Sequence, residues 1–240
     1  MGNYKIVTDE YELQRFINIL PDLTPDEKYY VTLFARKKYS DDTRFKADKT
    51  QLKRLIVNKQ DLIIELKKLE VAIGLYMFDG IVIPPDMLAV YINPNPRSMS
   101  KASLEMLSKM ADNLKKGQPL RNPKSEAMNC IQVTPSHKQF FDIDIDAKPN
   151  ERVEATDIFK WITDNEIINF DCIKMIKTRG GFHLLINTSL IQDAYVKRWY
   201  QGFTRIYVQD LGFDVMMNSD NLIPIPGCTQ GGYTPKLLTY

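Results

Sequence analysis

Three aspartates alternate with apolar residues in the segment Phe140-Phe141-Asp142-Ile143-Asp144-Ile145-Asp146. Successive side chains of a β-strand point to opposite faces, so this segment predicts a strand with a row of carboxylates on one face and isoleucines on the other. Neighbouring carboxylates in such a row lie roughly 6–7 Å apart and repel each other. The row therefore indicates either a site for Mg²⁺ or Mn²⁺, which prefer oxygen ligands, or the solvated face of an edge strand.

The elements expected around and after this strand follow the order β-α-β-β-α-β. They are strands at 139–145, 172–177, 182–187 and 221–225, and helices at about 153–166 and 191–208. This order is typical of the ferredoxin-like or RNA-recognition-type sandwich, in which helices cover one face of an antiparallel sheet. The expected fold class is α+β, as a two-layer α/β arrangement.

The N-terminal part predicts a second, smaller set of elements: helices at 8–20, 59–73 and 101–116, and a strand at 88–92. Thr24-Pro25-Asp26-Glu27 has the capping-box pattern of a helix start, but the β-branched and aromatic residues at 29–34 favour a strand. Ser100 is the expected N-cap of the third helix. The expected organisation is an N-terminal αβ unit at 1–117, a proline-containing connecting loop at 118–137 and a C-terminal unit at 138–240.

Composition excludes several classes of protein. The 240 residues are 44% hydrophobic and 26% charged, as in a globular protein, and the net charge is only +2. No apolar run reaches the length of a membrane span, and the N-terminus lacks a secretion signal. The three cysteines form no CxxC pattern, so neither a disulfide framework nor a zinc site is expected, and the reducing cytoplasm is the simplest location.

Two further segments contain residue types that bind phosphates. Thr178-Arg179-Gly180-Gly181-Phe182-His183 places two glycines and a histidine at the start of an apolar strand. Phe213-Asp214-Val215 is followed by a loop at 226–232 that contains three glycines. Glycines allow the backbone to approach a phosphate closely, but a single histidine at such a place is more often structural.

In their order along the chain, the three segments resemble the motifs of the archaeo-eukaryotic primase superfamily, which includes the primase-polymerases. FFDIDIDAKPN is similar to its acidic strand, GFH at 181–183 to its small-x-His motif, and FDVMMNSDNLIPIPGCTQGG to its aspartate motif and following PG loop. The resemblance covers roughly 138–236. It implies a DNA primase or primase-polymerase, which transfers nucleotides from NTP or dNTP to a 3′-hydroxyl during DNA replication.

The resemblance also implies roles for individual residues. Asp142, Asp144 and Asp214 would be the catalytic residues that hold two Mg²⁺ or Mn²⁺ ions, with Asp146 as the second choice. His183 would contact the incoming triphosphate, and the other expected nucleotide-binding residues are Arg179, Lys177, Gly181 and Lys236. Many relatives have an arginine where this chain has Pro224-Ile225. Either Arg179, Arg97 or Lys236 would then compensate, or the affinity for nucleotide would be low.

The partners implied are a single-stranded template or primer and nucleoside triphosphates, and a replicative helicase is a further candidate; no membrane is expected. Basic and aromatic residues of the N-terminal half are candidates for phosphate contacts: Arg36, Lys37, Lys38, Tyr39, Lys53 and Arg54. Two other functions stay open. One is a non-catalytic nucleic-acid-binding module in replication initiation, and the other is a metal-dependent nuclease, because clustered carboxylates serve both chemistries.

Overall fold

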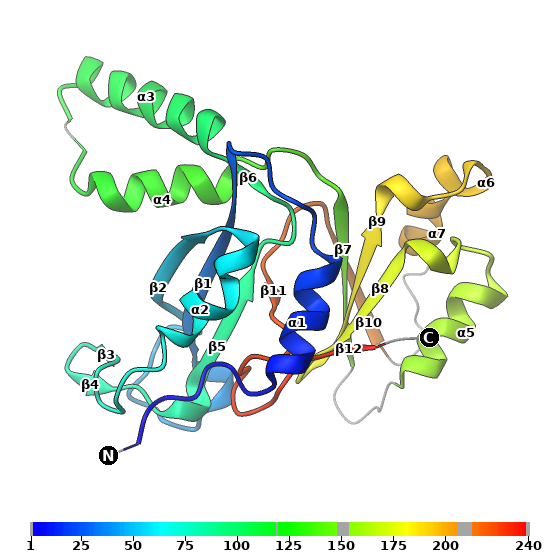
Figure 1. Cartoon of the computed structure of the whole chain (residues 1–240), viewed down its shortest axis with the longest axis horizontal. Coiled ribbons are helices and arrows are strands. Elements are labelled where there is room, and N and C mark those ends of the chain that lie inside the picture. The colour runs from blue at the N-terminus through cyan, green and yellow to red at the C-terminus, as the bar shows by residue number, and fades with distance from the viewer. Residues whose placement is uncertain (1, 119, 148–153, 206–212, 239–240) are drawn as a thin grey trace.

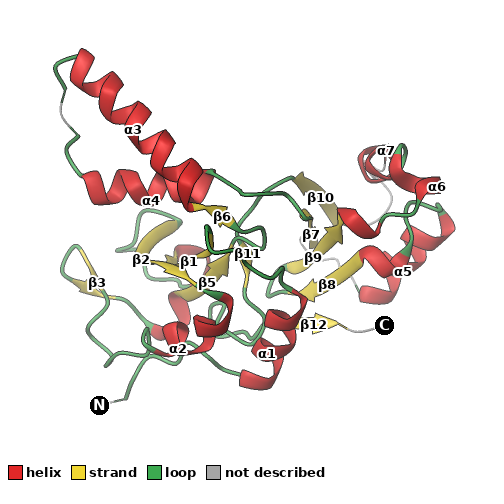
Figure 2. Cartoon of the chain, turned by 45° about the horizontal axis from the view of Figure 1, so that its top comes forward, coloured by secondary structure: helices red, strands yellow, loops and turns green. Residues whose placement is uncertain are grey.

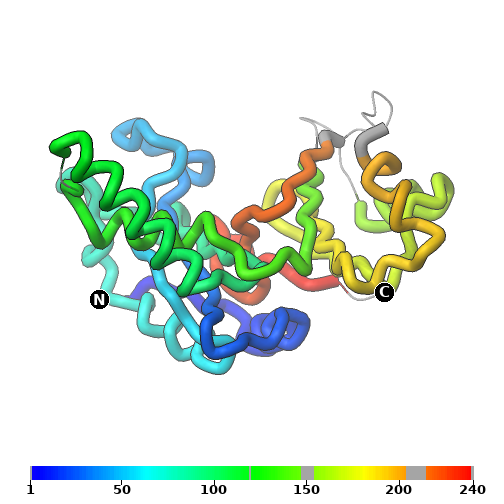
Figure 3. Tube along the Cα trace, turned by 90° about the horizontal axis from the view of Figure 1, so that it is seen from above, coloured from blue at the N-terminus to red at the C-terminus, as the bar shows by residue number. Residues whose placement is uncertain are grey.

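The computed structural model of the chain describes residues 2–118, 120–147, 154–205 and 213–238. Its two main sheets are built from antiparallel strand pairs, and helices pack against both (Figures 1 and 2). The predicted α+β class is confirmed. The two sheets and their helices lie side by side along the longest axis (Figure 1), and the end of the chain passes from the first set to the second (Figure 3).

The first sheet has the strand order β11-β5-β1-β2, and β6 pairs with the start of β1. Its strands are β1 (Glu27–Arg36), β2 (Lys49–Val57), β5 (Leu88–Ile92), β6 (Arg97–Ser98) and β11 (Ile223–Pro224). Helices α1 (Glu10–Ile19) and α2 (Leu62–Lys67) cover one face of this sheet. Leu33 and Ala35 of β1 point into that core, so the alternate residues Phe34 and Arg36 face the other way.

Two hairpins extend from the first sheet. A helical hairpin consists of α3 (Met99–Lys115) and α4 (Pro123–Val133), and a small β-hairpin consists of β3 (Met77–Phe78) and β4 (Ile81–Val82) (Figure 1). Short 3₁₀ helices occupy Lys37–Tyr39, Lys59–Asp61, Pro85–Met87, Phe170–Cys172 and Thr188–Leu190.

The second sheet has the strand order β10-β7-β9-β8-β12. Its strands are β7 (Phe140–Ala147), β8 (Ile173–Lys177), β9 (Gly181–Asn187), β10 (Phe213–Asn218) and β12 (Lys236–Leu238). Helices α5 (Ala155–Asp164), α6 (Asp193–Val196) and α7 (Trp199–Arg205) cover one face. Ile143 and Ile145 of β7 are fully buried there with Trp161 and Phe203. The three aspartates of β7 therefore lie on the opposite face, toward the first sheet.

Several predicted elements match the structure. The expected helix at 8–20 is α1, the strand at 88–92 is β5, and the strands at 139–145, 172–177 and 182–187 are β7, β8 and β9. The expected helix at 153–166 is α5, although residue 153 lies outside the described residues, as does the Lys148-Pro149-Asn150 part of the acidic motif. The expected helix at 191–208 forms two short helices instead, and its residues 206–208 also lie outside the described part.

Other predictions at the N-terminal side were partly wrong. The strand favoured at 29–34 is confirmed, since it lies within β1, but the helix start at Thr24 is wrong. Glu27 accepts a hydrogen bond from the Thr24 N–H (2.8 Å), as in a capping box, yet β1 begins at Glu27 and no helix follows. The helix expected at 59–73 ends at Lys67, because the chain then turns so that Ala72 pairs with Asn3. Helix α3 is capped by Ser98 rather than Ser100.

The connecting loop predicted at 118–137 contains helix α4, which starts with Asn122 as N-cap and proline at its first position. The strand predicted at 221–225 as the last strand of the C-terminal sheet is also wrong. Its residues Ile223 and Pro224 pair with β5 of the first sheet, whereas β10 is the strand beside β7. Because β10 and β11 belong to different sheets, the short segment between them joins the two.

Candidate active site

A cleft of about 420 Å³ lies where the acidic face of the second sheet meets the first sheet. From the second sheet it is lined by Asp144, Asp146, His183, Met216 and Asn218. From the first sheet and its 3₁₀ helix it is lined by Phe34, Arg36, Lys38, Lys49 and Tyr91. The segment that joins β10 to β11 adds Asn221 and Leu222. Acidic side chains thus form one wall of the cleft, and cationic side chains form the other.

The acidic wall contains a hydrogen-bonded histidine. His183 Nδ1 lies 2.9 Å from Asp142 Oδ1, and its Nε2 lies 3.5 Å from Asp144 Oδ1. Asp142 is only 2% exposed and does not line the cleft. Asp144 is partly exposed and Asp146 is exposed. The structure therefore brings Asp142, Asp144 and His183 together, but it directs Asp144 and Asp146 toward the open space.

The charges of this wall are strongly coupled. Burial alone would lower the pKa of His183, but the adjacent Asp142, followed by Asp144 and Asp146, raises that pKa to about 9. His183 is therefore a cation at neutral pH and can donate from both ring nitrogens. Burial raises the pKa of Asp144; the charge of His183 opposes this rise, and the neighbouring Asp146 and Asp142 add to it. A cation bound between Asp144 and Asp146 would relieve this repulsion.

Asp214 lies on the strand next to the acidic row. In the β10–β7 pair, Asp214 is opposite Asp146, Met216 is opposite Asp144 and Asn218 is opposite Asp142. Directly opposite residues of an antiparallel pair share a face of the sheet. The backbone register therefore puts position 214 at the end of the acidic row, although its side chain is outside the described part of the structure. Among the described side chains, no group of three or more His, Cys, Asp and Glu is arranged to hold a metal ion.

The basic wall is centred on Arg36, which is only 6% exposed. Its guanidinium donates to the Tyr91 hydroxyl (2.7 Å) and to Asp48 Oδ2 (3.1 Å), and its buried Nε has no hydrogen-bond partner among the described residues. Lys49 is directly opposite Arg36 across β1 and β2, and burial, with the nearby Arg36, lowers the pKa of Lys49. Arg36, Lys38 and Lys49 thus place three cations at this wall, and the Arg36 guanidinium is incompletely hydrogen-bonded. This arrangement favours an anionic ligand such as a phosphate group.

Arg36 and Lys38 were among the basic residues expected to contact phosphates, whereas Lys49 was missed. No local signal distinguishes Lys49 from the other lysines of the chain. Its position depends on its pairing with Arg36, and the β1–β2 hairpin would have had to be predicted first.

Lys177 and Lys236, expected at the nucleotide, are not brought to the cleft. They are opposite each other across β8 and β12. Lys177 also pairs with Phe182, and its Nζ lies 5.9 Å from the centroid of that ring. Since Phe182 is buried in the helix-side core, both lysines belong to the face of the sheet away from the aspartates.

Arg179 and Arg97, two other expected compensating cations, also lie elsewhere. The Arg179 guanidinium donates to the Gly231 carbonyl and lies over the Tyr39 ring, 4.6 Å from its centroid. Arg97 is completely buried and makes a bidentate ion pair with Asp220. The glycine loop at 226–232 is held by the first sheet, and only Gln230 of that loop lines the cleft.

Gly181 has a packing role that does not need a nucleotide. A Cβ atom at this position would lie 1.9 Å from the backbone oxygen of Ile145 on the neighbouring strand. This close approach explains why the chain has glycine at position 181.

Replacement of Gly181 by Ala should lower the free energy of unfolding by about 1–3 kcal/mol, because strands β7 and β9 must separate to accommodate the methyl group. Gly180→Ala is the matched control, since the nearest atom to its added Cβ would be the Asp146 carboxylate oxygen at 3.3 Å. Denaturant unfolding of both variants measures the difference. Equal stability of the two would contradict the packing role.

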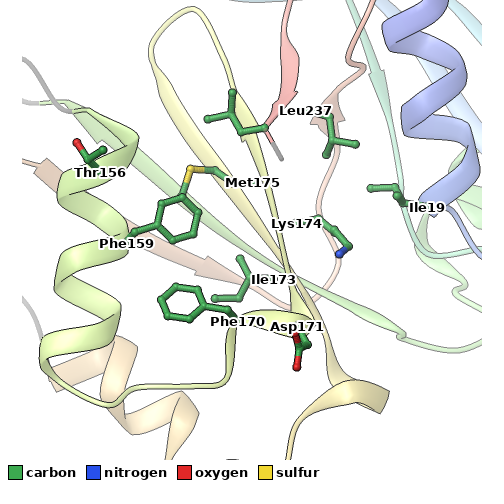
Figure 4. Close-up of a pocket in the computed structure, with 10 residues that line it drawn as sticks. Ile19, Thr156, Phe159, Phe170, Asp171, Ile173, Lys174, Met175 and Leu237 are labelled. Atoms are coloured by element: carbon green, nitrogen blue, oxygen red, sulfur yellow. The ribbon is translucent and has the colours of Figure 1, made fainter. Parts of the chain in front are cut away.

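A second cavity, of about 640 Å³, lies at the β8–β12 edge of the second sheet, between α5 and the end of α1 (Figure 4). Its walls are mostly apolar and include Ile19, Phe159, Phe170, Met175 and Leu237. Asp171, Lys174 and Thr156 are the polar residues of its lining. It is larger than the cleft but holds no cluster of acids or cations, so the cleft is the candidate active site.

Neither the protein-family models nor the curated proteins nor the solved structures to which we compared the chain gave a match. No helix in the described ranges is long and apolar enough to cross a lipid bilayer. The functional argument therefore rests on the geometry and electrostatics of the cleft.

Proposed function

We propose that the protein is a metal-dependent nucleotidyltransferase of the primase or primase-polymerase type, acting on nucleoside triphosphates and a single-stranded template in the cytoplasm. The observation that carries the proposal is the pairing of an acidic wall with a cationic wall across one cleft. Nucleotidyl transfer needs both, because carboxylates hold the divalent cation while fixed cations hold the triphosphate. The chemistry then depends mainly on positioning and charge stabilisation.

The topology of the second sheet is compatible with an RNA-recognition-type unit, which we propose for the segment from β7 to β10. Helix α5 connects β7 to β8, with β9 between these strands, and α6 and α7 connect β9 to β10, with β7 between them. Each connection is therefore a split βαβ unit, and all four strands are paired antiparallel.

The cleft geometry leads us to assign the acids differently from the sequence resemblance. Asp144 and Asp146 are the residues that would hold Mg²⁺ or Mn²⁺, with Asp214 as the third acid, because they lie at the open end of the row. Their carboxylate oxygens are the ligands that these hard cations prefer. When bound, the cation would neutralise phosphate charge and activate the attacking hydroxyl. Asp142 is buried and instead fixes the orientation and charge of His183.

The residues of the basic wall would hold the triphosphate. Pro224, at the place where many members of the resembled family have an arginine, pairs with Tyr91 across β11 and β5. Arg36 donates to the hydroxyl of the same Tyr91, so its guanidinium would supply a positive charge near Pro224, where this chain lacks the arginine. Lys38 interacts electrostatically with Asp144, which supports their placement on facing walls of one cleft.

The direct test is to incubate the protein with Mg²⁺ or Mn²⁺, a single-stranded template and labelled nucleotides, with and without a primer. Primer extension or de novo product is the expected result. Shortening of the labelled strand would identify a nuclease, and binding without turnover would identify a non-catalytic module. Either of those two results would overturn the proposal.

Arg36→Gln should raise the KM for nucleotide by about 10- to 100-fold, because a hydrogen bond to a charged group contributes about 1.5–3 kcal/mol. Steady-state extension kinetics measure KM, and thermal unfolding shows whether the variant is folded, since Arg36 also bonds Asp48 and Tyr91. The control is Arg54→Gln, because the guanidinium of Arg54 contacts Ser125 and Asn129 of α4 and does not line the cleft. An unchanged KM in folded Arg36→Gln would remove Arg36 from the nucleotide site.

A further inference from the structure

We infer that the chain forms a two-fold symmetric dimer, in which α3 of each copy packs against the β3–β4 hairpin of the other. This inference is independent of the proposed function, because neither surface lines the cleft. It rests on two exposed apolar surfaces that lie at the same end of the molecule. The segment around one of them is rich in Lys and Arg, and the segment around the other contains acidic residues and no Lys or Arg.

The first surface is one face of α3, defined by Leu104, Leu107, Met110 and Leu114. These residues follow one another at steps of three and four, so they form a continuous stripe on the helix. They are 68%, 62%, 41% and 68% exposed. Large apolar side chains that are exposed together on one face mark an interaction site. Helix α4 does not cover this stripe.

The second surface is the β3–β4 hairpin and the residues before it. Five large apolar side chains are exposed there: Ile73, Leu75, Met77, Phe78 and Val82. Asp79 and Gly80 form its tight turn, both with positive φ (49° and 77°). The hairpin is a separate two-stranded sheet, and such a hairpin is only marginally stable when it is exposed to water. Contact with a partner would bury its apolar side chains and stabilise it.

The charges around the two surfaces are complementary. The helical hairpin from 99 to 133 contains six Lys and Arg residues and three acidic residues. The segment from 69 to 96 contains no Lys or Arg but includes Glu70, Asp79 and Asp86. Opposite charges at the rim of an interface favour association and fix its register.

Both hairpins lie at the end of the long axis that is opposite to α5, α6 and α7 (Figures 1 and 2). A two-fold axis at this end can bring α3 of one copy to the β3–β4 hairpin of the other, and the same contact is then made a second time. An interface of this kind closes on itself and gives a dimer instead of a filament. Pairing α3 with α3 is disfavoured, because antiparallel helices would bring Lys101 near Lys115 and Lys116 of the other copy, and like charges across an interface oppose association.

Sedimentation velocity or light scattering of the full chain from about 1 to about 100 µM tests the inference. We expect the mass of a dimer, and we expect Leu107→Glu to give the monomer mass across this range. Leu190→Glu is the matched control, because Leu190 is 49% exposed in a 3₁₀ helix outside both surfaces. A monomeric wild-type chain at the highest concentration, or a dimeric Leu107→Glu variant, would overturn the inference.

A charge exchange tests the reciprocal geometry. Lys115→Glu/Lys116→Glu and Asp79→Asn/Asp86→Lys should each be monomeric, because like charges then meet at both contacts. An equimolar mixture should recover the dimer mass, since both contacts of the mixed dimer again join opposite charges. Circular dichroism checks that each variant is folded. If Asp79→Asn/Asp86→Lys alone remains dimeric, or if the folded variants do not associate on mixing, the proposed contact is wrong.

Discussion

Asp144→Asn should abolish nucleotide incorporation, with a loss of more than about 100-fold, while the protein stays folded. Substitution of a residue that merely supports a metal ligand typically costs about 10- to 100-fold, so loss of a ligand should exceed this. Folding should be retained, because the change removes one charge from a crowded row of carboxylates whose repulsion contributes to the raised pKa of Asp144. Primer extension with Mn²⁺ and with Mg²⁺ measures the loss, and Asp164→Asn, at the end of α5, is a control far from the row.

Primer extension together with a direct measurement of Mn²⁺ binding separates the two possible assignments of the acids. We expect Asp146→Asn to lose activity and to weaken Mn²⁺ binding, because Asp146 lines the cleft. We expect Asp142→Asn to lower stability, because the buried His183 loses its charged partner, but to change Mn²⁺ binding much less. If Asp142→Asn eliminates Mn²⁺ binding and Asp146→Asn does not, the assignment implied by the sequence resemblance is correct and the one based on the cleft is wrong.

The acidic row could be predicted because it depends on a local property of the chain. Alternation with a period of two identifies a strand and fixes which of its residues share a face, and β7 has this arrangement. Which aspartates reach open space could not be predicted in this way. That depends on His183, whose bond to Asp142 requires the pairing of β7 with β9.

The two misplaced lysines show the same limit. Lys177 is one residue out of phase with the face that carries His183, because His183 pairs with Ile176 across β8 and β9. Since a shift of one residue moves a side chain to the other face, the register of this hairpin decides the outcome. The basic wall was only partly accessible from the sequence, because Arg36 and Lys38 stood out as basic residues but Lys49 joins them only through the pairing of β2 with β1.

Helix α4, in contrast, had a local signal that was missed. Asn122 before Pro123 is the pattern of an N-cap followed by proline at the first helical position, and the structure uses it in this way. The prolines of the surrounding segment favoured a loop, although Pro123 favours a helix start at this particular place. The error therefore came from weighing composition above position.

Arg97→Met should lower the free energy of unfolding by about 3–5 kcal/mol, the cost of breaking a buried ion pair by removal of one partner. Arg97 is completely buried, and it donates to both carboxylate oxygens of Asp220 (2.6 and 2.5 Å) and to the Gln132 carbonyl (2.9 Å). Without Arg97, the Asp220 side chain, which is only 14% exposed, keeps a charge with no cation beside it. Denaturant unfolding measures the loss.

A double substitution distinguishes this cause from a simple loss of packing. Arg97→Met/Asp220→Leu removes both charges, so it should be more stable than Arg97→Met alone. Lys67→Met is the control for an exposed pair, because Lys67 and Glu10 are about half exposed, and a change of at most about 1 kcal/mol is expected. Asp220 precedes Asn221 and Leu222, which line the cleft, so Arg97 holds the segment that joins the two sheets at the proposed active site. A double variant no more stable than Arg97→Met would show that packing, and not the charge pair, fixes this segment.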